Sequence, residues 1–353
     1  MSAPRTPIHW PDPAREAAFQ DWLRPLCTVH GLDVASLAPA SADASFRRYF
    51  RLSGATRSLI VMDAPPPQED VRPFIEVAQR LHGAGLHAPR VLAADIAQGF
   101  LLLDDLGCEP YLQALQTGTP ARADALMRDA IGALVQWQAR GRSDALPPYD
   151  ESLLRREMDL FPQWCVGREH GLTWTAQQQA TWEQVSATLV ASALAQPTVA
   201  VHRDWMPRNL MVTEPNPGVL DFQDAVCGPV TYDIASLLRD AFISWDEERE
   251  IDWAARWWQQ ARSSGLFGDH PMGADFGECW RALEWMGMQR HLKVLGIFCR
   301  LKHRDGKPHY SSDLPRFFGY VARVAVRYRE LKPLIGLIEP MAGPLTATGY
   351  TLR

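Results

Sequence analysis

The stretch from His202 to Asp221 constrains this chain more than any other, because acidic and amide side chains stand in it at a specific spacing. Asn209 lies five residues after Asp204, and Asp221 lies twelve residues after Asn209. Phosphoryl transfer needs an acceptor hydroxyl held in line and a divalent ion that neutralises the phosphates. The spacing therefore indicates Asp204 as the base for the hydroxyl, with Asn209 and Asp221 as oxygen ligands of Mg²⁺.

A hairpin is predicted around these residues. Residues 197–201 form a short apolar run that is typical of a buried strand. Residues 214–218 have strong turn chemistry and separate two further apolar runs. If those runs pair, Met211 lies opposite Asp221 and Asn209 lies diagonally from it. Diagonal neighbours on one sheet face are about 7–8 Å apart at the backbone, so both side chains can reach one metal ion.

The tripeptide His-Arg-Asp occurs a second time, at residues 303–305. There the residue five positions beyond the aspartate is Tyr310, and no pair of apolar runs follows. We therefore interpret residues 303–305 as a loop and assign the chemistry to the first copy.

Composition excludes several classes of function. The 353 residues can form one large domain or two lobes around a cleft. A formal net charge of -5 argues against a protein that binds nucleic acid through bulk positive charge. The six cysteines are scattered without a C-x-x-C pair, which favours reduced thiols and a cytoplasmic location. No segment approaches the roughly 20 apolar residues of a membrane span, so no membrane partner is expected.

Hydrophobic periodicity divides the chain into a β-rich first part and a helical second part. Strands are expected at residues 46–52, 58–62, 90–94 and 99–103, with helices at 12–32 and 68–82. Further helices are expected at about residues 120–140, 150–164, 175–195, 233–263, 276–302 and 311–332. We expect a bilobal α+β fold, with a nucleotide-binding lobe at residues 1–105. Residues 106–353 then form a mostly helical lobe that carries the catalytic loop, metal site and acceptor pocket.

Several stretches of the sequence resemble the aminoglycoside phosphotransferase branch of kinase-like folds. Residues 228–235 read GPVTYDIA, similar to that branch's G-D-P-x-x-D-L-A motif. Three other stretches resemble one bacterial subgroup, the anomeric N-acetylmuramate/N-acetylglucosamine kinases: ASFRRYFR at 44–51, VMDAPP at 61–66 and QRHLKVLGIF at 289–298. The resemblance covers about residues 20 to 335. It implies a protein-kinase-like fold with a small β-rich N-lobe and a large, mostly helical C-lobe.

The resemblance also implies roles for individual residues. By this comparison Asp204 orients and deprotonates the sugar hydroxyl, while Asn209 and Asp221 hold Mg²⁺. His202 and Asp233 take structural roles. Asp233 is expected to brace the catalytic loop as a helix N-cap.

The first lobe departs from related kinases at the phosphates. Those kinases carry a lysine on the third strand, but the first lysine of this chain is Lys293. The glutamate that usually pairs with it, which we interpret as Glu76, is left without a lysine. Residues 41–45 contain no glycine. We expect backbone N–H groups and the hydroxyl of Ser45 to cradle the phosphates, helped by Arg47 or Arg48.

Backbone near the end of the 99–103 strand is expected to meet the adenine edge of ATP or GTP. The residues concerned are Leu103, Asp104, Asp105 and Leu106. Burial in a strand explains the leucine side chains fully, so the prediction of a hinge comes from the motif alone.

The acceptor pocket is predicted from scattered residues. Trp205, beside the base, is the first choice for an aromatic wall. Glu157 opens a segment that often lines the acceptor site in this branch, and Asp224 matches a second acid of the branch. Arg290 and Lys293 belong to a basic stripe that can receive the lactyl carboxylate of N-acetylmuramate. A solvated helix face is the alternative explanation of that stripe.

Three functions compete at this point. The first is Mg²⁺-dependent transfer of the ATP γ-phosphate to the anomeric C1 hydroxyl of N-acetylmuramate or N-acetylglucosamine in peptidoglycan recycling. The second is a kinase of another small alcohol, of the aminoglycoside, choline or homoserine type. The third is a non-catalytic nucleotide-binding scaffold, suggested by the missing lysine. A protein kinase is less favoured, because about eight residues separate Asp224 from Asp233, too few for a long activation segment.

Overall fold

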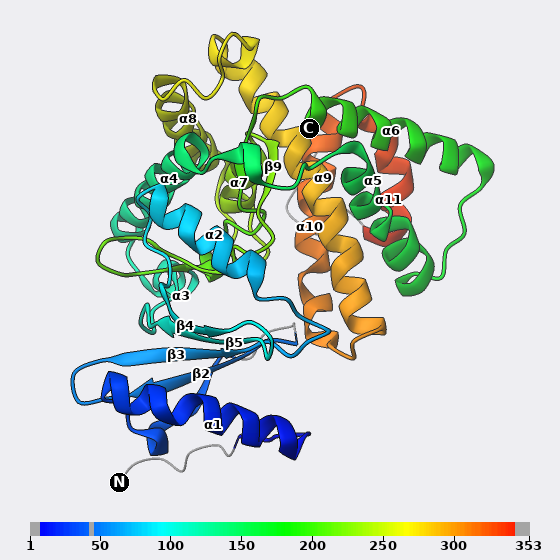
Figure 1. The fold of residues 1–353 in the computed structure, drawn as a ribbon. Coiled ribbons are helices and arrows are strands. Elements are labelled where there is room, and N and C mark those ends of the chain that lie inside the picture. Colours follow the sequence, from blue (N-terminus) through cyan, green and yellow to red (C-terminus); the bar gives the residue numbers. More distant parts are fainter. Residues whose placement is uncertain (1–7, 42–45, 343–353) are drawn as a thin grey trace. The chain divides into compact units, whose positions relative to one another are not determined.

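The computed structural model describes residues 8–41 and 46–342. The chain forms two compact units (Figure 1). The first comprises the chain as far as Glu109 together with the later segment Met211–Asp224, and the second comprises residues 110–210 and 225–353. The backbone therefore returns to the first unit directly after the segment 202–210.

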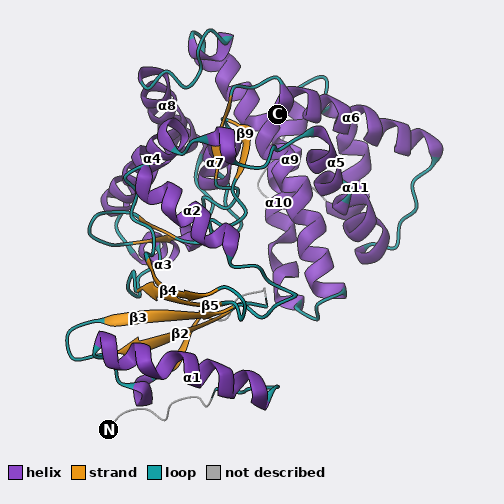
Figure 2. Ribbon diagram, viewed as in Figure 1, coloured by secondary structure: helices purple, strands orange, loops and turns teal. Residues whose placement is uncertain are grey.

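The first unit is built on an antiparallel sheet of five strands in the order β1-β2-β3-β5-β4. Its strands are β1 Ala38–Ser41, β2 Arg48–Ser53, β3 Ser58–Asp63, β4 Val91–Asp95 and β5 Phe100–Asp104. Helices α1 Pro13–His30 and α2 Arg72–Gly83 belong to the same unit. Figure 2 shows the orange strands of the sheet with α1 beside them.

Helix α1 covers one face of the sheet because both present apolar residues at the required period. On the helix, Phe19, Leu23 and Cys27 recur every four residues and are buried. On the sheet, alternate residues of three strands point toward them. The buried cluster contains Phe19, Leu23, Cys27, Leu32, Phe50, Leu52, Leu59, Val61, Phe100 and Leu102. The helix starts at the N-cap Asp12 and ends at Gly31, whose φ of 66° suits glycine.

An ion cluster fixes α1 to the sheet. The buried carboxylate of Asp63 accepts hydrogen bonds from Arg15 Nε at 3.0 Å and from Arg48 Nε at 2.9 Å. The guanidinium of Arg15 lies 4.4 Å from the ring centre of Phe100, and that of Arg48 lies 4.0 Å from the Trp10 ring. Asp63 therefore joins α1, β2 and β3 through one buried charge.

The second unit is mainly helical (Figure 2). Its helices are α3 Tyr111–Thr117, α4 Pro120–Arg140, α5 Glu151–Met158, α6 Ala176–Leu194, α7 Tyr232–Leu238, α8 Glu247–Ser263, α9 Phe276–His303, α10 Leu314–Arg327 and α11 Ile335–Ala342, with a π-helix at Phe161–Glu169. Strands β6 Thr198–Val201 and β9 Val226–Pro229 pair antiparallel. Among the described helices, none combines the length and the apolar character needed to cross a bilayer.

Helix α9 is the centre of this unit and packs against α6, α7, α10 and the π-helix. Gly296 allows the closest of these approaches, because a Cβ there would lie 2.5 Å from the Cβ of Leu160. Any larger residue at this position requires the two helices to separate.

Three of the expected helices are wrong in extent. The predicted helix 233–263 is two helices, because Asp246 caps a new one by accepting a hydrogen bond from Arg249 N at 2.9 Å. The predicted helix 150–164 ends at Met158 and is followed by the π-helix. The segment 311–332 begins as a 3-10 turn, and its α-helix covers only Leu314–Arg327.

A buried network of charges joins the helices of the second unit. Arg239 donates to Glu250 at 3.0 Å and to Glu284 at 2.9 Å, and all three side chains are fully buried. From α10, Arg323 bonds Glu250 at 2.8 Å and Arg327 bonds Glu284 at 2.7 Å. The network therefore connects the end of α7 with α8, α9 and α10.

We expect Glu284→Gln to destabilise the protein by about 3–5 kcal/mol, because it leaves buried arginine charge without its partner. Urea unfolding followed by circular dichroism measures the effect. The control is Glu278→Gln, which breaks the exposed pair with Arg281 on the same helix and costs at most about 1 kcal/mol. Equal shifts for the two variants would contradict the role of the network.

Candidate functional site

The loop from His202 to Asn209 is held by a carboxylate on α7. Asp233 accepts the backbone N–H of His202 at 2.7 Å and that of Arg203 at 2.9 Å. These two bonds fix a strained turn, since Arg203 has a φ of 76°. Asp233 lies in the first turn of α7, and Thr231 occupies the N-cap position without a capping bond. Asp233 therefore contacts the loop, but the expectation that it does so as an N-cap is wrong.

Burial dominates the electrostatics of Asp233. It raises the pKa of this carboxyl to about 7, with a further contribution from the nearby charge of Asp204. The two backbone N–H groups and the charge of Arg290 oppose this rise. The loop is thus held by a buried acid that titrates near neutral pH.

His202 and Trp205 form the inner side of the loop. Both are fully buried, and their rings meet edge to face with centroids 5.4 Å apart. His202 Nδ1 accepts the backbone N–H of Asp204 at 3.2 Å. The structural position expected for His202 agrees with this packing. The ring of Trp205 offers no surface to a substrate in this structure, in contrast to the expected aromatic wall.

Asp204 is half-buried, and its charge acts on Arg203 and Lys293. Its backbone carbonyl accepts a hydrogen bond from Asn209 Nδ2 at 3.0 Å. Within residues 8–41 and 46–342, no side chain donates to the Asp204 carboxylate. A carboxylate held on a braced loop without a protein donor is suited to accept a proton from a substrate hydroxyl.

Asp221 belongs to the first unit and follows a shorter hairpin than expected. The hairpin strands are β7 Leu210–Met211 and β8 Gly218–Val219. Asp221 lies beyond β8 with a φ of 59°, a left-handed conformation that aspartate tolerates. The prediction that Met211 pairs opposite Asp221 across extended strands is therefore wrong.

The segment that carries Asp221 is anchored by its neighbours. Phe222 is fully buried, and its ring centroid lies 4.6 Å from that of Phe74 on α2. Gln223 Nε2 donates to Asp221 Oδ1 at 2.9 Å. Asp224 is exposed, 3.4 Å from the same amide.

The two adjacent arginines of the first unit point in different directions, as neighbouring residues of an extended chain do. Arg47 Nη2 lies 4.0 Å from Asp221 Oδ1, and Arg47 Nε lies 3.6 Å from Glu69 Oε2. Arg48 instead bonds Asp63 and the backbone carbonyl of His9. Ser45 lies outside the described residues.

The predicted hinge residues span the end of β5, with Leu103 and Asp104 in the strand and Asp105 and Leu106 after it. Leu103 and Leu106 are buried, and the backbone N–H of Asp104 donates to Arg90 O at 3.1 Å. Asp105 has a structural side chain, which the sequence did not suggest. Burial opposes its ionisation, but hydrogen bonds from Arg51 and Ser58, each 2.6 Å, hold the pKa of Asp105 below its ordinary value.

Glu157 lies in a buried cluster within the second unit. Arg203 and Lys293 both bond its carboxylate, Lys293 Nζ at 3.0 Å, and Tyr149 donates its hydroxyl to the other oxygen. Lys293 also bonds the hydroxyl of Tyr232 at 3.1 Å. Burial opposes the charge on Glu157, but Lys293 and Arg203 outweigh it and hold the pKa of Glu157 below its ordinary value.

The basic stripe predicted on α9 is not a solvated face. Arg290 and Lys293 are 3% and 8% exposed and point into the unit, while Arg304 is exposed and pairs with Asp305. Arg203 was missed by the sequence analysis, although it stands next to Asp204. Only its pairing with the buried Glu157, which also binds Lys293, marks Arg203 as a site residue, and the spacing of residues along the chain does not reveal this pairing.

Asn209 and Asp221 each carry an oxygen donor of the kind that magnesium prefers. In the described part of the chain, no group of three or more histidine, cysteine, aspartate or glutamate side chains forms a metal cage. Magnesium needs only one or two protein oxygens when phosphates and water complete its shell. The amide oxygen of Asn209 and the carboxylate of Asp221 are ligands of this kind.

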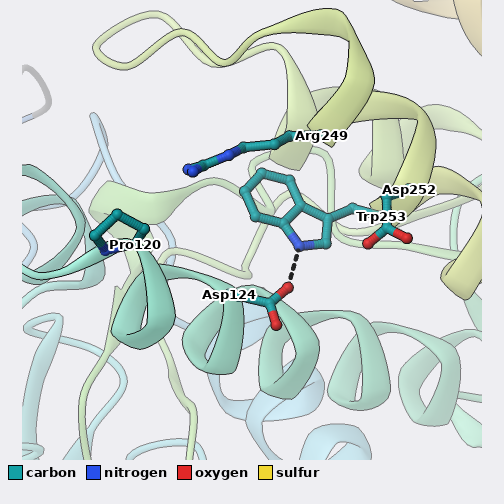
Figure 3. Close-up of a pocket in the computed structure, with 5 residues that line it drawn as sticks. All are labelled: Pro120, Asp124, Arg249, Asp252 and Trp253. Carbon is teal, nitrogen blue, oxygen red and sulfur yellow. Dashed lines mark hydrogen bonds between the residues drawn. The ribbon is translucent and has the colours of Figure 1, made fainter.

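A depression on the second unit is unrelated to these residues (Figure 3). Asp124 Oδ1 accepts the indole N–H of Trp253 at 2.9 Å there. The depression is lined by Pro120, Asp124, Arg249, Asp252 and Trp253. None of the predicted site residues is among them.

Comparison with known proteins gives the affiliation. The model of the phosphotransferase enzyme family matches residues 36–274. The N-acetylmuramate/N-acetylglucosamine kinase of Pseudomonas putida is 55% identical over 306 residues, which cover 87% of this chain and 88% of that protein.

Two solved structures share the fold. Choline kinase from Cryptosporidium parvum is 12% identical with a TM-score of 0.58, over 93% of this chain and 99% of that chain. ADP-bound aminoglycoside phosphotransferase APH(2'')-Ib is 15% identical with a TM-score of 0.53, over 84% of this chain and 96% of that chain.

The structural likeness confirms the predicted protein-kinase-like fold, a five-stranded antiparallel sheet followed by a mostly helical part. The family match spans more than half of the chain, and the Pseudomonas putida relative covers most of it. The resemblance seen in residues 228–235 is thereby confirmed, and the chain belongs to the phosphotransferase enzyme family.

Proposed function

We propose that this protein is an N-acetylmuramate/N-acetylglucosamine kinase, which transfers the γ-phosphate of ATP to the anomeric C1 hydroxyl of the amino sugar. The observation that carries the proposal is the braced loop that presents the Asp204 carboxylate without a protein donor. The 55% identity to the Pseudomonas putida kinase supports this choice of acceptor. We further propose that the protein acts in the cytoplasm, where ATP is available, and that its reaction belongs to peptidoglycan recycling.

Four residues have distinct tasks in this mechanism: two in the loop, one beyond β8 and one on α7. Asp204 orients the sugar hydroxyl and accepts its proton as the oxygen attacks phosphorus. Asn209 and Asp221 hold Mg²⁺, which when bound neutralises charge on the phosphates. Asp233 keeps the loop in place before substrate arrives, so little reorganisation remains for the reaction itself.

The nucleotide is proposed to bind in the first unit. Backbone groups of residues 103–106 meet the base, and Ser45 with its neighbouring N–H groups contacts the phosphates. Arg47 is preferred to Arg48 as the phosphate-binding arginine, because Arg48 already neutralises Asp63. We propose that residues 1–105 bind the nucleotide and that residues 106–353 bind the acceptor, apart from the segment Met211–Asp224, which belongs to the first unit.

The acceptor is proposed to bind beside the buried cluster of Glu157, Lys293 and Arg203. The two cations exceed the one carboxylate by a single positive charge, which suits an anionic lactyl group. The charge of Asp204 acts on both Arg203 and Lys293, which supports a location near the base. Arg290 is more buried than Lys293, and we propose that it acts on the site only through its charge on Asp233. Asp224 is proposed as a polar contact of the acceptor.

Phosphorylation of a panel of alcohols tests the proposal. The protein is incubated with Mg-ATP and N-acetylmuramate, N-acetylglucosamine, choline or an aminoglycoside, and ³¹P NMR locates the product phosphate. We expect a C1 phosphate on the two amino sugars only. Turnover of choline or the aminoglycoside alone, or no turnover at all, would contradict it.

Asp204→Asn should lower kcat by about 100-fold or more, the scale of general-base assistance. ATP affinity, measured by calorimetry, should stay within about twofold of wild type, because the nucleotide does not depend on this base. Asp269→Asn, at an exposed position of the second unit, serves as the matched control for loss of an acidic side chain. Near-wild-type turnover by Asp204→Asn would remove Asp204 as the base.

Asp233→Asn should lower kcat by roughly 10- to 100-fold, because an amide N–H then faces a backbone N–H of the loop. The variant should also change the pH dependence of stability. The raised pKa of Asp233, about 7 in the folded protein, favours folding with the proton bound. Its contribution is therefore complete below about pH 3.9 and is lost as the pH rises through about 7.

The urea midpoint between pH 4 and pH 8 measures this difference. Wild-type stability should exceed that of Asp233→Asn most at pH 4, and the gap should narrow toward pH 8. A gap that stays constant across this range would show that Asp233 is ionised throughout it in the folded protein, and would contradict the raised pKa.

A further inference from the structure

The first unit must bind phosphate without a lysine, because the sequence has none before Lys293. Arginine is the remaining permanent cation. Three arginines close to the sheet already serve carboxylates: Arg15 and Arg48 bond Asp63, and Arg51 bonds Asp105. These pairs join α1 and the strands, so they belong to the framework of the unit.

Arg47 has a different arrangement. Its side chain is 12% exposed and lies between two carboxylates, those of Glu69 and Asp221. Nε lies toward Glu69 at 3.6 Å, whereas Nη2 lies toward Asp221 at 4.0 Å. The guanidinium thus uses its inner edge for one acid and directs its outer end toward the proposed metal ligand.

Glu69 fixes the backbone of this segment as well as the side chain. Its Oε1 accepts the N–H of Phe46 at 3.3 Å, while Oε2 faces Arg47. One carboxylate, placed just before α2, therefore sets both where residue 47 stands and how its guanidinium is turned. Glu76, the partner expected for a lysine, is exposed on α2.

Charge balance explains why a carboxylate beside Arg47 is useful. With Asp221 binding a divalent cation, Arg47 and that cation repel each other, and a flexible arginine would move away. A retained pair with Glu69 keeps the guanidinium close. Its outer N–H groups can then bond phosphate oxygens, which arginine contacts more strongly than neutral donors do.

We infer that Glu69 is a positioning residue that holds Arg47 as the phosphate-binding cation, in place of a lysine–glutamate pair. The inference rests on the proposed function, since it presumes that a nucleoside triphosphate binds in the first unit. It assigns to Glu69 a role in nucleotide affinity and no contact with the acceptor.

Calorimetric binding of ATP and AMP to the full-length protein, with Mg²⁺ present, tests the inference. Arg47→Ala should weaken ATP binding about 10-fold or more, the scale of a charge-assisted hydrogen bond, and change AMP binding by less than about twofold. Glu69→Gln should weaken ATP binding roughly 5- to 10-fold. Glu76→Gln, seven residues later, is the matched control and should change neither affinity.

A double-mutant cycle separates positioning from an independent effect. If Glu69 acts through Arg47, then Glu69→Gln should add little to Arg47→Ala, and the two changes should be strongly non-additive. The KM for ATP should rise in each variant while the KM for the amino sugar stays constant. Arg47→Lys should recover part of the ATP affinity only when Glu69 is present.

Several results would overturn the inference. Unchanged ATP affinity in Arg47→Ala, equal losses for ATP and AMP, or additive effects of the two substitutions would each do so. Failure of the proposed function gives a different result. In that case the variants show the expected changes in ATP affinity, but the wild-type protein phosphorylates no amino sugar. Unfolding midpoints near wild type confirm that the variants are folded.

Discussion

The rest of the proposed site depends on two hydrogen bonds, which the backbone N–H groups of His202 and Arg203 donate to the carboxylate of Asp233. They hold a left-handed residue, Arg203, between a buried histidine and the proposed base. Without them the strain of that turn has no compensation, and the loop could relax. Asp233 is itself buried on the short helix α7, which packs against α9. The position of the loop therefore depends on that helix packing.

Charge is used in this protein at three depths. Arg239, Glu250 and Glu284 form a fully buried network that joins helices. Removing one partner is strongly destabilising, because it leaves a buried charge without compensation. Glu157 with Arg203 and Lys293 forms a second cluster, less enclosed and next to the proposed base. Arg47 and Glu69 form the third, in the first unit, and both side chains are partly exposed.

The sequence was sufficient for the fold class because its signals are local. Period-two strands, the α1 face and the HxD…N…D spacing can each be read from a few residues. The buried clusters could not be predicted, since Glu157, Arg203 and Lys293 are separated by 46 residues or more and meet only through tertiary packing. The same reason explains why the α9 residues were interpreted as a basic surface.

Local conformation set the other limit. The left-handed turn at Asp221 ends the hairpin early, and no composition rule marked it. The fully buried ring of Trp205 shows that an aromatic residue next to a base can serve the loop itself. Glu76 was suggested by its helical position, whereas the contacts of Glu69 with Arg47 and Phe46 form only in the folded chain and leave no local pattern in the sequence.

We propose above all that Asn209 and Asp221 together hold the divalent ion of the bound nucleotide, whose γ-phosphate goes to the hydroxyl that Asp204 deprotonates. Binding of Mn²⁺ in the presence of ATP, followed by electron paramagnetic resonance, tests this most directly in the wild type, Asn209→Ala, Asp221→Ala and the double variant. The expected result is weaker Mn²⁺ binding in each single variant, with effects that are non-additive in the double variant. Mn²⁺ affinity in the presence of ATP that is unchanged by either substitution would contradict the claim.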